Sequence, residues 1–203
     1  MKTVGSIRKE KIFKKATMLF TKRGFEKTTL KEIGRVSGIK GEGIYHYFAS
    51  KEKLLLDILE IAENKFKMNV LDVIEKIKEP EEKLKVLINN MTKLIAGGGE
   101  AALLMDSSIL RGCNKKVINE IKKRERNVLY LTRDLLKEVD KINRASRPVD
   151  PTLGAFCLFS MMGNIYRWYN PKGRITVSEL VKDFEKIFFY GYLGIGTTKR
   201  KVH

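Results

Sequence analysis

Apolar residues recur every three or four positions along most of the chain, which is the spacing that places them on one face of an α-helix. The clearest stripes are Ile12, Ala16, Leu19 and Phe20; Leu55, Ile58, Leu59, Ala62 and Phe66; and Leu84, Leu87, Ile88, Met91, Leu94 and Ile95. Further helical runs cover residues 117–139, 153–169 and 177–193. Strand-like alternation of apolar and polar residues is hard to find. The pattern therefore predicts an all-α fold.

Residues that start or stop helices lie between these stripes. Three consecutive glycines, residues 97–99, follow the third stripe and end it, because glycine is a poor helix former. Asp150 followed by Pro151 is typical of an N-cap with proline at the first helical position. Thr176 and Glu179 have the spacing of a capping box. We therefore expect separate helices that begin near residues 151 and 177.

Positive charge exceeds negative charge and is concentrated toward the N-terminus. The 203 residues include 41 Lys or Arg and 24 Asp or Glu, a formal net charge of +17. Residues 1–53 hold 14 of the basic and 5 of the acidic side chains, so this quarter is about three times as basic per residue as the rest. The surplus favours a nucleic acid or an acidic membrane surface as partner and argues against a polycationic substrate. We place the anionic partner at the N-terminal segment.

The composition limits the class of protein further. With 43% hydrophobic residues the chain is too apolar for a disordered protein. Its longest uncharged stretch, residues 151–166, is shorter than the roughly 20 apolar residues of a membrane span, and early charged residues argue against a signal peptide. We expect a cytoplasmic protein with no membrane partner. Cys113 and Cys157 lack the spacing of a zinc site or a disulfide framework, so we expect no metal and no cofactor.

Motifs of catalysis are also missing. The sequence contains no GxSxG, HExxH, P-loop or glycine-rich dinucleotide fingerprint, and His46 and His203 are its only histidines. No carboxylate pair stands out among the acidic residues. We therefore expect that the protein is not an enzyme.

The segment from Thr28 to Phe48 combines two short helical patterns with a tight break. Thr29 and Glu32 have capping-box spacing, and Gly38 permits a turn. A helix-turn-helix needs two short helices and a tight turn, because its first helix packs against the second while the second keeps one face free for the major groove. On spacing alone, an ordinary helical hairpin is an equal alternative.

Taken together, the residues of this region resemble the TetR family of bacterial transcriptional regulators. The resemblance lies within residues 7–55 and is carried by Gly24-Phe25, Thr28-Thr29, Ile33, Gly38-Ile39, the run IYHYF from Ile44 to Phe48, and Ser50-Lys51-Glu52. It implies an all-helical homodimer of about nine helices per chain, three for DNA binding and the others for ligand binding and dimerisation. We accordingly predict a helix-turn-helix domain at residues 1–50, a helical ligand-binding and dimerisation domain at 51–195, and a basic tail at 196–203.

The same resemblance implies the residues that contact DNA. Thr29 and Lys51, each at the start of a helix, are expected to contact phosphates. The recognition helix is placed at about Lys40 to Tyr47, with Ile44 and Phe48 in the core; its side chains directed to DNA are Lys40, Glu42, Tyr45, His46 and Tyr47. Lysine reads guanine and glutamate accepts from cytosine, whereas tyrosine hydroxyls hold phosphates. For His46, a surface aromatic without a contact is the alternative.

The recognition segment departs from the family, in which most members have Ser-Lys-Gly-Thr. Here Lys40-Gly41-Glu42-Gly43 enters the helix, with no hydroxyl cap and with two glycines. Each glycine costs about 1 kcal/mol of helix stability relative to alanine. We therefore predict that this helix is loosely ordered in the absence of DNA.

The C-terminal part suggests a dimer and an effector. Residues 151–169 are apolar around most of a helix, and with residues 176–193 they suit a four-helix contact between two copies, the alternative being a monomer core. Residues 163–173 and the Phe-rich helix after them resemble the TetR branch that governs fatty-acid catabolism and responds to acyl-CoA thioesters. Candidate residues of an apolar effector pocket are Phe66, Met91, Leu94, Leu104, Tyr130, Phe156, Phe159, Met162 and Tyr166, with Arg167 for an anion. Ordinary core packing is the alternative for each.

The sequence therefore indicates a homodimeric repressor that a small apolar or amphipathic effector, a fatty acid or an acyl-CoA, releases from a palindromic operator in double-stranded DNA. The alternative is a non-specific nucleoid or RNA-binding helical protein, which leaves the apolar C-terminal part without a role.

Overall fold

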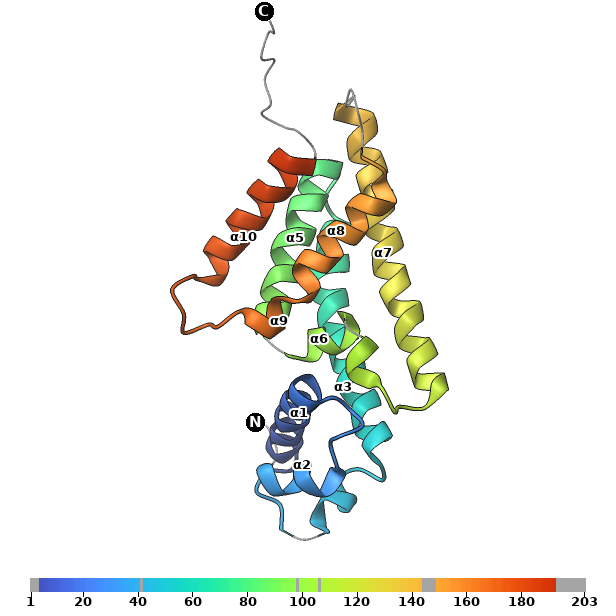
Figure 1. Cartoon of the computed structure of the whole chain (residues 1–203), viewed down its shortest axis with the longest axis vertical. Coiled ribbons are helices and arrows are strands. Elements are labelled where there is room, and N and C mark those ends of the chain that lie inside the picture. The colour runs from blue at the N-terminus through green and yellow to red at the C-terminus, as the bar shows by residue number, and fades with distance from the viewer. Residues whose placement is uncertain (1–3, 41, 98, 106, 144–148, 193–203) are drawn as a thin grey trace, which may run out of the picture. The chain divides into compact units, whose positions relative to one another are not determined.

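The computed structural model describes residues 4–40, 42–97, 99–105, 107–143 and 149–192 (Figure 1). In these residues all regular secondary structure is helical and no strand occurs, which confirms the all-α prediction, and the number of helices is close to the expected nine. The basic tail predicted at residues 196–203 lies outside the described residues, as do Gly41 and Gly98.

The chain forms two compact units. Of the described residues, those within 1–64 and 98–125 form unit 1, and those within 65–97 and 126–203 form unit 2. Two helices pass from one unit into the other, namely α3 (Lys51–Phe66) and α7 (Lys115–Asn143). The functional boundary that we place at residue 50 stays a prediction.

Unit 1 is arranged around α1 (Val4–Arg23), whose buried face includes Ile12 and Phe20. Helix α2 (Leu30–Val36), helix α6 (Gly99–Met105) and the 3-10 helix η3 (Ser107–Leu110) all pack against it. Helix α6 approaches closely at Gly99, where an added Cβ would lie 2.8 Å from Cγ2 of Thr17. The short 3-10 helix η1 (Gly43–His46) follows α2 and packs against it.

Unit 2 is arranged around α5 (Pro80–Gly97), which lies between α10 (Val177–Lys186) and α8 (Pro151–Gly163) in Figure 1. The short helix α9 (Ile165–Trp168) also packs on α5, and a π-helix, η4 (Ile187–Tyr192), extends α10. The stripe from Leu84 to Ile95 supplies the buried face of α5. The helix predicted between Pro80 and the glycines at 97–99 is therefore confirmed.

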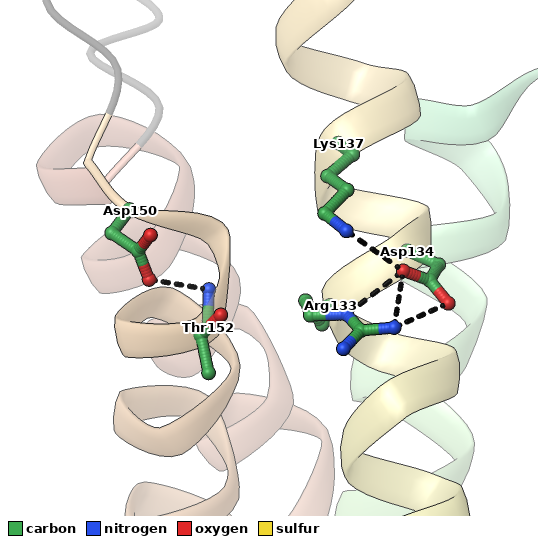
Figure 2. A network of polar contacts seen from close by, with 5 residues as sticks. All are labelled: Arg133, Asp134, Lys137, Asp150 and Thr152. Carbon is green, nitrogen blue, oxygen red and sulfur yellow. Dashed lines mark hydrogen bonds and ion pairs between the residues drawn. The ribbon is translucent and has the colours of Figure 1, made fainter.

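The predicted caps of α8 and α10 are present. The Asp150 carboxylate accepts a hydrogen bond from the backbone N–H group of Thr152 at 2.9 Å (Figure 2) and another from that of Leu153 at 3.0 Å. Thr176 and Glu179 form the complete capping box, with the Thr176 hydroxyl 3.2 Å from the Glu179 nitrogen and the Glu179 carboxylate 2.8 Å from the Thr176 nitrogen. Both signals involve residues within one helical turn, so the local sequence is enough to specify them.

The helix that begins at Lys51 contains one wide turn. Helix α3 continues through the π-helix η2 (Lys67–Leu71) into α4 (Asp72–Ile74). One row of its buried apolar residues recurs at four-residue intervals, namely Leu54, Ile58, Ala62, Phe66, Val70 and Ile74, and Leu55 and Leu59 are buried beside the start of this row. Steps of four residues exceed one α-helical turn by about 40° each, so this stripe would drift by about 200° on an uninterrupted α-helix. The π turn holds one extra residue and returns Val70 and Ile74 to the buried side.

Candidate nucleic-acid interface and effector cavity

Helix α2 begins at a Thr29 cap and ends in a turn at Gly38. The Thr29 side-chain oxygen accepts a hydrogen bond from the Glu32 backbone nitrogen at 3.1 Å. The Glu32 carboxylate pairs with Arg23 of α1, so the structure has the threonine half of the predicted capping box. Gly38 has a φ of +80°, a left-handed conformation that glycine adopts without strain. The predicted first helix and turn are therefore present.

Helix α2 and η1 approach each other closely at Gly34. An added Cβ at Gly34 would lie 3.0 Å from the Cβ of Ile44, which is fully buried. Phe48 is also buried, and its ring lies 5.5 Å from the ring of Phe13 in an edge-on arrangement. The core positions predicted for Ile44 and Phe48 are therefore confirmed, and α2 braces the following segment through Ile44.

The recognition helix is shorter than predicted. In place of an α-helix from about Lys40 to Tyr47, the structure has the 3-10 helix η1, whose N-cap residue Glu42 makes no side-chain capping bond. The backbone nitrogens of Tyr45 and Tyr47 bond to the carbonyls three residues earlier. The missing hydroxyl cap and the glycines explain why one tight turn forms instead of a longer α-helix. The loose order that we expect without DNA stays a prediction.

Most of the side chains expected to contact DNA are exposed on this segment. Thr29, Lys40, Glu42, Tyr45 and His46 are exposed, and Tyr47 is half-buried. The Glu42 carboxylate lies 3.2 Å from Nζ of Lys31. Exposed ion pairs of this kind are weak, so this contact leaves Glu42 able to exchange Lys31 for another donor.

Lys51 is engaged within unit 1. Its Nζ donates hydrogen bonds to the backbone oxygens of Phe25 and Thr28, at 2.8 and 2.9 Å, and lies 4.1 Å from the centre of the Phe25 ring. Two of the three ammonium donors thus tie the start of α3 to the loop before α2. The phosphate contact expected for Lys51 stays a prediction, and the structure adds a structural role to it.

A basic hollow lies beside η1 and was not predicted. Its lining includes Arg8 and Lys11 of α1 together with Ser37, Lys40 and His46. Arg8 and Lys11 are exposed. Their spacing of one helical turn is the sequence feature that could have indicated a shared basic surface. Nothing in the sequence pairs them with Lys40, because that depends on how α1 packs against the turn.

The residues expected to bind an effector differ in burial and in the unit to which they belong, and their role stays a prediction. Phe66, Met91 and Met162 are buried in unit 2, whereas buried Leu104 belongs to unit 1. Leu94, Phe159 and Tyr166 are half-buried, and Tyr130, Phe156 and Arg167 are exposed. The Arg167 guanidinium donates to the Tyr166 hydroxyl at 2.8 Å. None of these residues is among those that line the cavity described next.

Unit 2 contains a cavity of about 410 Å³ between η2–α4, α5 and α7. Its apolar lining consists of Leu71, Ile74, Leu131 and Leu135, and its charged lining of Glu75, Lys83, Asp134 and Glu138. The volume lies in the range of small-molecule sites. The π turn η2 contributes Leu71, and π turns are frequent at functional sites.

The Asp134 carboxylate is paired with two cations of its own helix. Arg133 donates to its carboxylate at 2.8 Å and Lys137 at 3.3 Å, so that both cations point at Asp134 (Figure 2). The hydrogen bond from Arg133 is the main cause that lowers the pKa of Asp134. Glu75 and Glu138 therefore supply most of the negative charge available at the cavity.

The described residues show neither a metal site nor a membrane-spanning helix. They hold no group of three or more His, Cys, Asp or Glu side chains placed to bind a metal ion. No helix among them is long and apolar enough to cross a membrane.

Both parts of the chain match models of known protein families. Residues 12–58 match the family described as bacterial regulatory proteins, tetR family, and residues 78–192 match the family described as tetracyclin repressor-like, C-terminal domain. The HTH-type transcriptional repressor KstR2 of Mycobacterium tuberculosis is 21% identical over 184 residues, which cover 91% of this chain and 92% of KstR2.

Solved structures share the whole fold. The structure of AibR in complex with isovaleryl coenzyme A and operator DNA has a TM-score of 0.75 and 25% identity, covering 89% of this chain and 97% of the AibR chain. A transcriptional regulator of the TetR/AcrR family from Thermobifida fusca has a TM-score of 0.61 and 28% identity, covering 91% of this chain and 98% of its own.

Proposed function

Because this chain belongs to the TetR family of bacterial regulatory proteins, we propose that it is a sequence-specific repressor that binds operator DNA in the cytoplasm and is not an enzyme. The observation that carries the proposal is the arrangement of α2 and η1. Ile44 anchors η1 against Gly34, while Tyr45 and His46 on the same turn stay exposed. This is how a helix-turn-helix presents side chains to the major groove.

The proposed contacts divide into two kinds. Glu42 and His46 reach base edges, and Thr29 and the hydroxyls of the two tyrosines hold phosphates. Lys40 can donate to either kind of partner, since guanine and phosphate both accept from an ammonium group. The exposed cap at Thr29 supports its role, because the N-terminus of a helix carries partial positive charge. Lys51 contributes mainly by holding the loop before α2 in place.

The operator experiment selects genomic fragments with the purified protein at physiological salt and sequences them. A palindrome with half-sites about one or two helical turns apart supports the proposal. Recovery of no motif, with binding that collapses as salt rises, supports the non-specific alternative instead. Tyr45 and Tyr130 are 45% and 46% exposed, so Tyr130→Ala is the matched control for Tyr45→Ala. We expect Tyr45→Ala alone to lower operator affinity.

The proposed repressor is a homodimer. Large apolar side chains are exposed on the C-terminal helices, with Leu153 and Phe156 of α8 at 55% and 52% and Ile187 and Tyr190 of η4 at 61% each. An apolar surface of this kind supports contact with a second copy through two helices from each chain. Sedimentation velocity at micromolar concentration tests this. A single 23 kDa species would contradict it.

The cavity in unit 2 is the proposed effector site. Its apolar residues suit a short acyl chain, and the structural relative AibR binds isovaleryl coenzyme A. The phosphates of a coenzyme A group would have to avoid Glu75 and Glu138. An effector with higher affinity for the state that does not bind DNA must weaken operator binding, and it does so by the same factor by which operator DNA weakens effector binding.

The effector experiment measures the melting temperature and the operator affinity in the presence of fatty acids and acyl-CoAs of increasing chain length. Leu131→Phe fills part of the cavity, whereas Ile142→Phe adds the same ring to an exposed position on the same helix. We expect Leu131→Phe alone to abolish the response while operator binding persists. Failure of every acyl compound to change either quantity would contradict this part of the proposal.

A further inference from the structure

The basic hollow in unit 1 lies between the first turns of α1 and the segment that leads into η1, and it measures about 500 Å³. Arg8 and Lys11 line it from α1, and Lys40 lines it from the other side. No Asp or Glu is among the described residues that line it. Three permanent cations therefore surround one space that holds no compensating charge from the chain.

These cations are also unpaired. In the described part of the chain, Arg8, Lys11 and Lys40 make neither an ion pair nor a hydrogen bond from their side chains. Like charges gathered around one space repel one another, and an anion placed among them removes that repulsion. The arrangement therefore fits a negatively charged group better than an empty space.

A second, independent observation is the Ser37 hydroxyl. Ser37 lines the hollow and is 6% exposed, and in the described part of the chain its side-chain oxygen has no hydrogen-bond partner. Its backbone nitrogen already bonds to the carbonyls of Ile33 and Gly34. A buried hydroxyl without a partner is destabilising, and because its oxygen is shielded from solvent, it donates to an anion in the hollow once the Ser37 side chain turns toward that space.

The backbone at Gly38 keeps the Lys11 side of the hollow open. Gly38 has a φ of +80°, and an added Cβ there would lie 3.4 Å from Nζ of Lys11. Without that Cβ, the ammonium group and the turn can both face a bound anion. The hollow is also larger than one tetrahedral anion needs, which leaves room for a substituent beside Ile39 and Tyr47.

From these observations we infer that the hollow is a phosphate-binding site formed by Arg8, Lys11, Lys40 and the Ser37 hydroxyl. A phosphate has several acceptor oxygens, which suits donors that converge from α1 and from the turn. Two sources supply this chemistry, a phosphodiester of DNA beside the bases read by η1, or free inorganic phosphate. For the first source the inference rests on the proposed DNA binding, and for the second it does not.

The test compares Lys11→Met and Ser37→Ala with Lys14→Met, an exposed lysine on the same helix that does not line the hollow. In the DNA arm, the affinity for a selected fragment is measured from low to high KCl. Each phosphate contact contributes about 0.9 to the slope of log K against log salt. We expect Lys11→Met to reduce that slope by about 1 on every DNA sequence and Lys14→Met to leave it unchanged.

In the phosphate arm, the melting temperature of the DNA-free protein is measured in inorganic phosphate and in chloride at equal ionic strength. We expect phosphate to stabilise the wild type and Lys14→Met, and to lose this effect with Lys11→Met. Ser37→Ala should melt higher than the wild type in chloride, because it removes a buried hydroxyl without a partner, and should gain less from phosphate. A purely structural serine would not show these opposite changes.

A loss confined to the DNA arm supports the site with DNA as its source, and a loss confined to the phosphate arm supports it with free phosphate. Lys11→Met that matches Lys14→Met in both arms would overturn the inference. The proposed function can fail on its own. If no motif is selected but phosphate binding is retained, the phosphate site stands and the repressor proposal does not. If a motif is selected but the salt slopes are unchanged and phosphate has no effect, only the repressor proposal stands.

Discussion

Replacing Lys51 by methionine tests whether this lysine holds unit 1 together. The substitution keeps the length and apolar stem of the side chain but removes the ammonium that bonds to the carbonyls of Phe25 and Thr28, at 2.8 and 2.9 Å. It also removes the charge above the Phe25 ring. The loop before α2 then loses its tie to the start of α3.

The expected loss follows from these contacts. Hydrogen bonds to a charged group contribute about 1.5–3 kcal/mol each, and a cation–π contact adds about 0.5–1 kcal/mol at an exposed site. Lys51 is half-buried, so water replaces part of what is lost, and we expect a decrease of about 2–4 kcal/mol in the free energy of unfolding. For a chain of this length, 1 kcal/mol corresponds to about 2–4 °C, which gives a fall in melting temperature of about 5–15 °C.

The assay is thermal unfolding followed by circular dichroism, with Lys53→Met as the control. Lys53 lies on the same helix and makes an exposed ion pair with Asp57 at 2.7 Å, which contributes little to stability. A Lys51→Met variant that melts with the wild type would refute the structural role. The salt dependence of DNA binding tests the other role, since Lys51→Met should reduce the log–log slope by about 1 if Lys51 contacts a phosphate directly.

Other substitutions test other parts of the structure. Gly34→Ala should destabilise unit 1 in denaturant unfolding, because the new Cβ would lie 3.0 Å from the Cβ of Ile44. The cost of overpacking, about 1–3 kcal/mol, exceeds the gain in helix propensity of about 1 kcal/mol. Unchanged stability would contradict the close approach. In the folded protein Cys113 should react slowly with a thiol reagent at neutral pH, since it is buried and that burial raises its pKa; a reaction of Cys113 as fast in the folded as in the unfolded protein would disprove this. Backbone N–H bonds, that of Leu153 first, lower the pKa of Asp150, so its contribution to stability is present above the unfolded pKa of about 4 and is lost as pH falls through the lower folded value. Asp150→Asn should therefore make the melting temperature less dependent on pH in this range, and an unaltered acid profile would count against the cap.

Features that depend on neighbouring residues could be predicted from the sequence. The cap at Asp150 and the capping box at Thr176 each involve residues no more than three positions apart. The burial of Ile44 and Phe48 followed from a periodic pattern and from the family resemblance. Each cap lies within one helix, and Ile44 packs on the preceding helix α2, whereas the contact of Phe48 with Phe13 of α1 is one that the pattern does not specify.

Features that depend on how helices pack could not be predicted. Lys51 bonds to carbonyls 26 and 23 positions away in the sequence, so its inward role depends on how α3 meets the loop before α2. The effector residues were chosen for size and apolarity, but these properties do not distinguish a side chain that lines a cavity from one that fills a core. Glu75 and Glu138 line the cavity, and a search for apolar residues passes over them.

The wide turn at η2 makes the number of residues in this helix part of its structure. Deleting exposed Met68 would remove the one residue that the π turn holds in excess, so an ordinary α-helix could run through the segment with Val70 and Ile74 still on the buried side. Deleting exposed Glu60, before the wide turn, would instead turn every later side chain by about 100° about the axis, and Leu71 and Ile74 would no longer line the cavity as they do now. The segment should therefore tolerate the loss of one residue within the wide turn, but not the loss of one residue before it.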